Sequence, residues 1–243
     1  MPMDQHNPTP DITHDYERVR SYSRGAQLVF ENAEALYNEA QMLGQAGSFA
    51  RAAALHQISM EECAKIDMLG AHATSILMGH EVDDDRIAKV FREHKLKNYA
   101  NAYNATVTPA EEEARTRGDW KASSEAFKKF QRDFHVEVNT IKNAALYVDY
   151  KDGQFMAPKQ AVTEPIAVAF MHLNAEFLQR SDGFVRLLRK MESDPNTYSD
   201  LVKRFTERAM ALRAEGKSDP ESVLDTLMKE MYADYASAMS RKD

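Results

Sequence analysis

Apolar residues that recur every three or four positions constrain this chain more than any other feature of its sequence. One such stripe runs through residues 22–44 and consists of Val29, Ala33, Leu36, Ala40 and Leu43. This spacing places the side chains on one face of an α-helix. Only nine glycines and eight prolines occur in 243 residues, which is little material for the turns of a β-sandwich or barrel. The sequence therefore predicts an all-α protein.

The same periodicity predicts seven helices, over residues 22–44, 49–78, 86–105, 124–150, 163–191, 198–215 and 220–239. In the fourth of these helices the residues expected to face inward are Phe127, Phe130, Phe134, Ile141 and Val148. We expect a loop or insertion over 106–124 and a turn at Asp152-Gly153. Residues 1–15 are predicted to be a flexible tail, residues 16–192 a helical core, and residues 193–243 a C-terminal helical extension.

Several classes of protein are excluded by composition and spacing. A net charge of −7 argues against a protein that coats nucleic acid non-specifically. A single cysteine, Cys63, excludes internal disulfides and a Cys-rich zinc site. No histidine follows a glutamate by three positions, so the Glu-x-x-His pairs of di-iron bundles are absent, and we expect no metal and no cofactor. His172 and Glu176, one helical turn apart, are weak evidence for a metal. No apolar run is long enough to span a bilayer and the N-terminus does not resemble a signal peptide, so we expect a cytoplasmic protein without membrane contact.

Polar side chains fall on the apolar face of the helix predicted over 49–78. On a helical wheel Arg51, Glu62 and Lys65 lie inside the inward arc, and Glu61 lies at its edge. Charged residues are almost never buried without partners, so these side chains are expected to meet one another or a polar site. A structural ion pair at the edge of the core explains them equally well.

The helix predicted over 86–105 changes character halfway along its inward face. Ile87, Val90 and Phe91 begin this face, and it is continued by His94, Lys97, Asn98 and Asn101. An imidazole beside cations suits attack on a phosphodiester, because it exchanges protons near neutral pH. Lys97, Lys65, Arg51 or Arg92 would neutralise charge on the phosphoryl oxygens. The basic residues of this segment also suit an anionic ligand, although a solvated helix face accounts for them about as well; they are Arg86, Lys89, Arg92, Lys95 and Lys97.

Five blocks between about residues 25 and 160 resemble AbiV-type abortive-infection proteins, which belong to the HEPN superfamily. In order they are Asn32-Ala33-x-x-Leu36-Tyr37-x-x-Ala40-x-x-Leu43, then Arg51-Ala52-x-x-Leu55, then Glu61-Glu62-Cys63-Ala64-Lys65, then Phe91-x-x-His94-x-x-Lys97, and last Leu146-Tyr147-Val148-Asp149. The Arg-x4-6-His pattern of HEPN nucleases is matched literally only by Arg51 and His56. Helical geometry separates these two side chains by roughly 140°, and His56 falls off the inward arc.

This resemblance implies a HEPN-like antiparallel helical bundle that dimerises and cleaves RNA without a metal. The protein would be an antiphage effector that shuts down translation by acting on tRNA, rRNA or mRNA, controlled by a phage-encoded activator or a cognate inhibitor. His94 would be the acid/base group, with Lys97, Lys65 and Arg51 on the phosphate side and Glu62 and Glu61 orienting them. The residues expected to bind RNA are Arg92, Lys95, Lys89, Asn98 and Asn101.

Two other functions stay open at this point. The first is a non-catalytic helical module that blocks translation by binding a phage or ribosomal protein. Its contacts would come from the extension, through Met210, Leu212, Leu224, Leu227, Met228, Met231 and Tyr232, although these residues are also explained by packing on the core. The second is a protein that binds small nucleotides, which a nucleotide would stabilise against heat.

Overall fold

The structure, a computed structural model, describes residues 12–105, 107–216, 223, 226–227 and 229–230. The bounded elements within these residues are nine helices and a two-stranded hairpin, which confirms the predicted all-α class. In chain order they are α1 (Ile12–Gln45), α2 (Phe49–Leu77), α3 (Asp84–Arg92), α4 (His94–Ala102), α5 (Pro109–Thr116), α6 (Trp120–Leu146), β1 (Asp149–Lys151), β2 (Gln154–Met156), α7 (Pro158–Ala161), α8 (Glu164–Ser193) and α9 (Pro195–Ala214).

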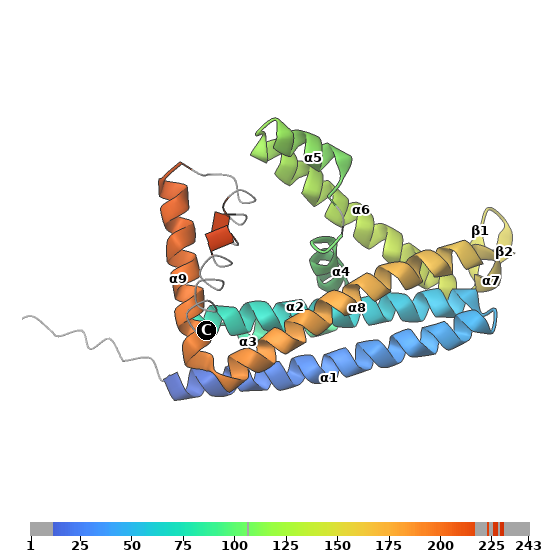
Figure 1. The fold of residues 1–243 in the computed structure, drawn as a ribbon. Coiled ribbons are helices and arrows are strands. Elements are labelled where there is room, and N and C mark those ends of the chain that lie inside the picture. Colours follow the sequence, from blue (N-terminus) through green and yellow to red (C-terminus); the bar gives the residue numbers. More distant parts are fainter. Residues whose placement is uncertain (1–11, 106, 217–222, 224–225, 228, 231–243) are drawn as a thin grey trace, which may run out of the picture.

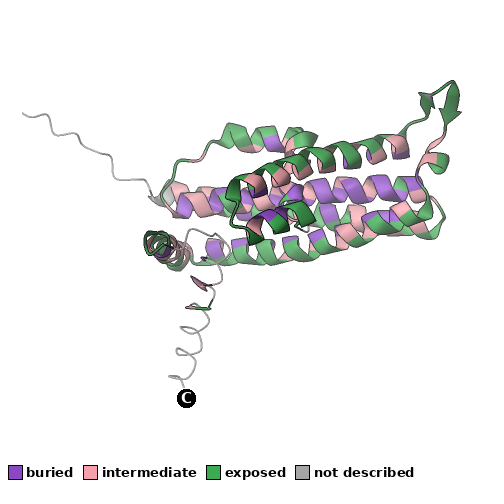
Figure 2. Cartoon of the chain, turned by 90° about the horizontal axis from the view of Figure 1, so that it is seen from above, coloured by how far each residue is buried: buried purple, intermediate pink, exposed green. Residues whose placement is uncertain are grey.

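The central helix is α2, which packs along α1 and α8 and also contacts α4 and α6 (Figure 1). The chain reverses between α1 and α2 at Gly47, whose φ of 76° is in the left-handed region that glycine adopts without strain. Buried residues run along α2 and many are small, as shown by Ala52, Ala53, Ala54, Ala64 and Ala73 (Figure 2). Small side chains let neighbouring helices approach α2 closely from several sides.

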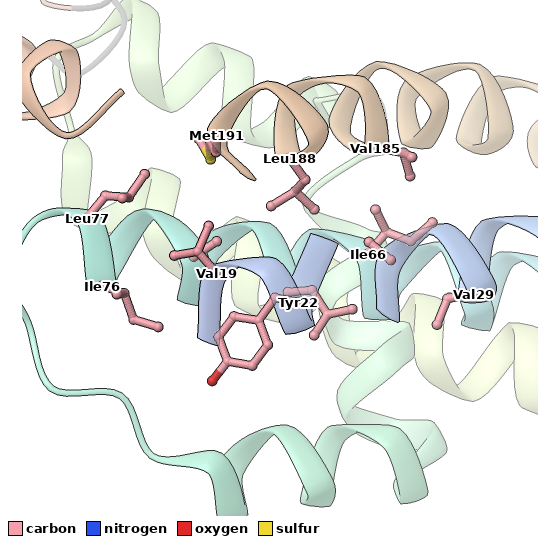
Figure 3. Close-up of a cluster of buried hydrophobic side chains, with 12 residues drawn as sticks. Val19, Tyr22, Val29, Ile66, Ile76, Leu77, Val185, Leu188 and Met191 are labelled. Carbon is pink, nitrogen blue, oxygen red and sulfur yellow. The ribbon is translucent and has the colours of Figure 1, made fainter. Parts of the chain in front are cut away.

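The apolar core is divided into three clusters along the bundle. Figure 3 shows the one at the α9 end, where α1, α2 and α8 contribute Val19, Tyr22, Ile66, Leu188 and Met191 among others. The middle cluster adds α6 and is formed by Ala33, Met60, Cys63, Val138, Phe170 and Phe177. The third, at the hairpin end, contains Ala50, Ala53, Ala54, Ala145, Val162 and Ala167. The C-terminal half of α6 is thereby fixed against α2.

The single helix predicted over 86–105 is two helices, α3 and α4. Asp83 caps α3 by accepting the Asp85 N–H, and the chain leaves the helix at Glu93, where φ is −94° and ψ is 110°. The apolar face of α3 and the polar face of α4 therefore belong to separate elements, and α4 takes its own direction (Figure 1). The wheel, which assumes one continuous axis, cannot detect such a break.

The segment predicted to be a loop over 106–124 contains α5 and the start of α6. The Thr108 side chain accepts the Glu111 N–H and Pro109 occupies the first turn, which is a standard helix start. Asp119 caps α6 in the same way by accepting the Ala122 N–H. At the other end α6 stops at Leu146, so Val148, predicted to face inward, is exposed just before the hairpin instead. Asp152 and Gly153 form the predicted turn, between β1 and β2.

The two ends of the chain depart from the predicted bounds. α1 begins at Ile12, ten residues earlier than predicted, because Val19 and Tyr22 also pack into the core. The rest of the predicted tail, residues 1–11, lies outside the described residues. In the extension, Leu212 packs with Val223 and Leu227, while Met210 is exposed. Leu224, Met228, Met231 and Tyr232 lie outside the described residues, as does most of the helix predicted over 220–239.

Among the helices of the described residues, none combines the length and the apolar character needed to cross a bilayer.

Candidate functional site

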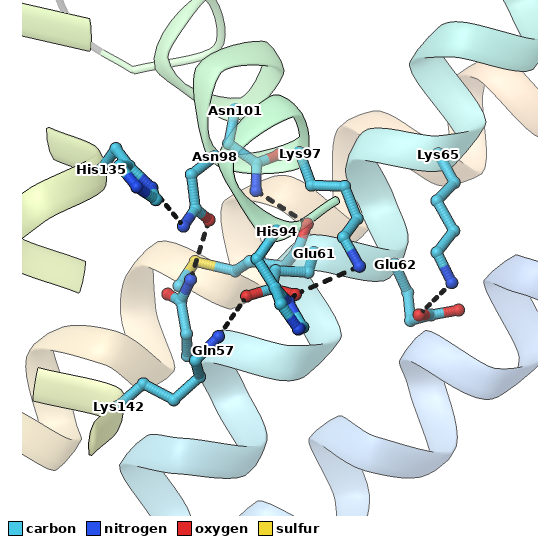
Figure 4. Close-up of polar contacts among 11 residues, drawn as sticks. Gln57, Glu61, Glu62, Lys65, His94, Lys97, Asn98, Asn101, His135 and Lys142 are labelled. Atoms are coloured by element: carbon cyan, nitrogen blue, oxygen red, sulfur yellow. Dashed lines mark hydrogen bonds and ion pairs between the residues drawn. The ribbon is translucent and has the colours of Figure 1, made fainter. Parts of the chain in front are cut away.

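A buried carboxylate, Glu61, lies at the centre of a charged cluster formed by α2, α4 and α6 (Figure 4). Its residue is only 1% exposed. Lys142 Nζ lies 2.8 Å from Glu61 Oε1, Lys97 Nζ lies 3.3 Å from Oε2, and His94 Nδ1 also contacts Oε2. We call Glu61, His94, Lys97 and Lys142 the Glu61 cluster.

The break at Glu93 positions two members of this cluster. His94 is the first residue of α4 and Lys97 lies in the same first turn, so both side chains reach back to α2 from the start of the helix. Lys142 comes from the C-terminal part of α6, where Val138 and Ala145 on the same face are buried. Two separate helices, α4 and α6, therefore bring cations to one carboxylate on a third, α2.

Opposing effects set the pKa of Glu61. Burial acts to raise it, because a carboxylate loses its hydration in the interior. The hydrogen bonds from Lys142 and His94 and the charges of these groups outweigh burial, so the pKa lies below its ordinary value. Glu61 is therefore ionised at neutral pH.

The cluster holds more buried positive than negative charge. The Lys97 and Lys142 residues are 5% and 8% exposed, and both ammonium groups contact the same carboxylate. Within the described part of the chain, no other carboxylate lies within ion-pair distance of either one. Burying an uncompensated charge is costly. An anionic ligand at this site would supply the compensating charge.

His94 forms the exposed side of the cluster, since 59% of its side chain is accessible against 2% for the Glu61 side chain. An ionised carboxylate only accepts hydrogen bonds, so the shared proton belongs to Nδ1 of the imidazole. The neutral ring then carries its free lone pair on Nε2. His94 is thus oriented by a buried carboxylate in the way that general bases are.

Buried amides fix α4 on α2 beside the cluster. Gln57 Nε2 donates to Asn98 Oδ1 over 3.0 Å, and Asn98 Nδ2 donates to His135 Nδ1 over 3.2 Å. Asn101 Nδ2 donates to the Met60 carbonyl over 2.9 Å. Asn98 and Asn101 were expected to contact RNA, but exposures of 0% and 1% place them in the helix interface instead.

Three of the predicted catalytic residues lie apart from the cluster. Glu62 and Lys65 form their own ion pair at 2.5 Å (Figure 4). Lys65 Nζ also lies 5.0 Å from the centre of the Phe91 ring. Arg51 is exposed and donates to the Leu146 carbonyl. It precedes Glu61 by ten residues, which is roughly 15 Å along a helix axis. A wheel gives the direction of a side chain but not its height, so it grouped residues that the structure separates.

The other predicted RNA-binding residues, Lys89, Arg92 and Lys95, are exposed on α3 and α4. Sequence reasoning missed Lys142 and His135 as members of the site. Lys142 continues the face of Val138 and precedes Ala145 by three positions, so the search for charges on apolar faces would have found it in α6. Burial and the nearby ammonium groups of Lys95 and Lys142 lower the pKa of His135.

His56, expected off the inward arc, is buried at 2% exposure. The expectation was wrong because other helices pack around α2, so side chains on more than one of its faces are buried. The His56 Nδ1 accepts from Asn174 Nδ2 over 3.1 Å, and Ser59 Oγ lies 3.1 Å from Asn174 Oδ1 and 2.8 Å from the Ala33 carbonyl. Burial lowers the pKa of His56 to about 4. We call His56, Ser59 and Asn174 the His56 cluster.

The remaining candidate ligands and nucleophiles are not assembled into a site. Burial raises the pKa of the Cys63 thiol to about 12, so it is not a thiolate. His172 and Glu176 are both exposed on α8. Within the described ranges no three His, Cys, Asp or Glu side chains are grouped as metal ligands would be.

The match to a family model covers the charged cluster completely. A family model described as AbiV, of the HEPN group, matches residues 21–179, which include every member of the Glu61 cluster. An uncharacterized protein of Sinorhizobium fredii, y4gJ, is 33% identical over 112 residues. That alignment covers 46% of this chain and 58% of the relative, so the chain spans somewhat more than half of the length of that protein. No solved structure matches the chain.

Proposed function

Because this chain belongs to the AbiV family of HEPN proteins, we propose that it is an antiphage abortive-infection effector and that it cleaves RNA at the Glu61 cluster. The observation that supports this activity is the excess of buried positive charge beside an exposed, carboxylate-oriented imidazole. The same arrangement serves both requirements of RNA cleavage, attraction of a phosphate and transfer of a proton.

His94 is the catalytic residue of this proposal. Its Nε2 takes the proton of a ribose 2′-hydroxyl while the 2′-oxygen forms a bond to the adjacent phosphorus. The bond from phosphorus to the 5′-oxygen breaks, and the proton returns from an imidazolium or a water molecule to that leaving oxygen. The products are a 2′,3′-cyclic phosphate and a free 5′-hydroxyl. The step consumes no co-reactant, so we expect cleavage to persist in EDTA.

Glu61, Lys97 and Lys142 are positioning residues, since their side chains are buried behind His94. Glu61 holds the imidazole tautomer and stabilises the imidazolium that forms. The two ammonium groups keep Glu61 ionised and leave a net positive field for the phosphoryl oxygens.

The test is cleavage of total bacterial RNA by the purified full-length protein in EDTA. We expect discrete fragments from the wild type and a loss of about 10²- to 10⁴-fold in His94→Ala, the usual contribution of a general acid–base group. His172→Ala is the matched control, because His172 is also an exposed helical histidine but lies on α8. Fragments that persist in His94→Ala, or that disappear equally in His172→Ala, would refute the assignment.

The proposal extends to control of the activity. An RNA-cleaving effector harms its own cell, so we propose that a phage-encoded activator or a cognate inhibitor sets when it acts, and that the active form is a homodimer. Light scattering of the purified protein tests the dimer. Addition of phage lysate to the cleavage reaction tests the activator.

A further inference from the structure

An open groove lies on the other side of α4, between α3 and α4, and has a volume of about 670 Å³. This volume lies within the range of sites for small molecules. Met68, Val90 and Leu96 give the groove an apolar lining, and α4 contributes two tyrosines, Tyr99 and Tyr103.

Tyr103 is an aromatic platform at the edge of this groove. Its residue is 71% exposed, and its ring centre lies 4.6 Å from that of Phe127, which supports one side. An exposed and supported aromatic ring beside an apolar lining is suited to stacking on a planar base.

Cations from both helices lie at the groove. Arg86 and Lys89 of α3 line it, and on α4 Lys95 Nζ lies 5.4 Å from the centre of the Tyr99 ring. The two carboxylates in the lining, Asp83 and Asp85, are at the N-terminal end of α3, and Asp83 is engaged as its helix cap. Lys89, one turn beyond Asp85 on α3, and Lys95, on α4, are therefore the cations placed for phosphates away from the start of α3.

The groove adjoins the Glu61 cluster through His135. The His135 ring meets the Tyr99 ring edge-on, with centres 5.8 Å apart, and its Nδ1 accepts from Asn98 in the amide layer behind the cluster. His94 and Lys95 are consecutive, one contacting Glu61 and the other covering Tyr99. The groove and the cluster are thus linked through α4 and His135.

We propose that this groove binds an unpaired nucleotide of single-stranded RNA, with its base stacked on Tyr103 and its phosphates next to Lys89 and Lys95. The inference rests on the proposed function, since it names the substrate class of the same site. A duplex keeps its bases paired and stacked within the helix, where a side chain on a groove wall does not reach their faces. Single-stranded RNA, in contrast, offers such faces.

The test is fluorescence anisotropy of the full-length protein with a labelled, 2′-O-methylated oligouridylate. The methyl group removes the nucleophile of the proposed cleavage, so binding is measured whether or not the protein is a nuclease. We expect Tyr103→Ala to raise the Kd about tenfold and Tyr103→Trp to restore it, because tryptophan keeps a stacking surface. Tyr150→Ala is the control, since Tyr150 is 62% exposed but lies in the β1–β2 hairpin.

A duplex of the same length should bind more weakly and with no dependence on Tyr103. The groove proposal is wrong if Tyr103→Ala binds the single strand as tightly as the wild type, if Tyr150→Ala loses as much, or if the protein does not bind the oligonucleotide. If cleavage requires His94 but Tyr103→Ala does not weaken binding, the groove proposal is wrong and the nuclease proposal stands. If binding depends on Tyr103 but the wild type does not cleave RNA, the nuclease proposal is wrong and the groove proposal stands.

Discussion

Two histidines near the middle of the bundle have opposite surroundings, although their clusters both start from α2. In the His56 cluster the imidazole is buried and neutral, and its partners are amide and hydroxyl groups. In the Glu61 cluster the imidazole is exposed, and its partner is an ionised carboxylate that two lysines hold.

The contrast separates a histidine that stabilises from one that can act. His56 reaches no solvent, and with a pKa of about 4 it does not exchange protons near neutral pH. His94 is both accessible and oriented. The literal Arg-x4-His match therefore contains His56, which is structural, whereas the chemistry that we propose belongs to His94.

The largest effect should come from removing the carboxylate of the Glu61 cluster. Glu61→Ala leaves two buried ammonium groups without a partner, and we expect it to lower the free energy of unfolding by about 3–5 kcal/mol. Urea denaturation at neutral pH measures this change. Replacing all three charges, with Glu61→Leu, Lys97→Met and Lys142→Met together, should restore stability without restoring cleavage. A stable Glu61→Ala protein would contradict the description of the cluster.

Acid should weaken the His56 cluster in a defined window of pH. The folded pKa of His56, about 4, is below the unfolded value of about 6.5, so the unfolded state takes up the proton first as the pH falls. Stability from this group is complete above about pH 6.5 and is lost as the pH falls toward 4. At pH 5 the loss is about 2 kcal/mol.

Urea denaturation of wild type and His56→Gln at pH 7 and pH 5 isolates the contribution of His56 protonation to the free energy of unfolding. The wild type should lose about 2 kcal/mol more than the variant. The Glu61 cluster behaves differently, because the pKa of Glu61 is lowered from 4.5 and its contribution is lost only at more acidic pH. Equal losses in both proteins would show that His56 is not buried as a neutral group.

A smaller effect is expected when only one of the two ammonium groups is removed. Lys142→Met leaves a one-to-one pair of Lys97 and Glu61, so we expect the free energy of unfolding to change by less than about 1 kcal/mol. The rate of cleavage should fall about tenfold, because the positive field of the Glu61 cluster at the phosphate weakens. Lys142→Arg, which keeps the charge, is the control, and its rate should stay closer to the wild type. A Lys142→Met protein with unchanged cleavage would show that the excess charge has no role in the reaction.

The smallest effect is expected from replacing Arg51, the arginine of the literal Arg-x4-His match. Arg51 is exposed and lies outside both clusters, so Arg51→Ala should change stability by less than about 0.5 kcal/mol and leave cleavage unchanged. Parallel cleavage and urea assays check both values. A large loss of cleavage in Arg51→Ala would restore the literal motif as the site.

Much of the fold is encoded locally and was predicted from the sequence. Apolar spacing identified α2 and α8 nearly to their ends, and Asp152-Gly153 marked the hairpin turn. The same spacing identified polar side chains on apolar faces, among them Glu61, His94 and Lys97. It missed α5, since Thr108 and Pro109 start that helix within a polar stretch that has no apolar stripe.

Only the tertiary structure decided which of these side chains meet. Side-chain direction repeats every 3.6 residues and is visible in a sequence, whereas height along the axis and the partner across an interface are not. Lys142 reaches Glu61 from 81 residues away, and the break at Glu93 aims His94 and Lys97 at the same carboxylate. The sequence determined that this is a helical protein with charges on its inner faces. The packing of α2, α4 and α6 decided that Glu61, Lys97 and Lys142 meet His94 in one cluster, because each contact joins different helices.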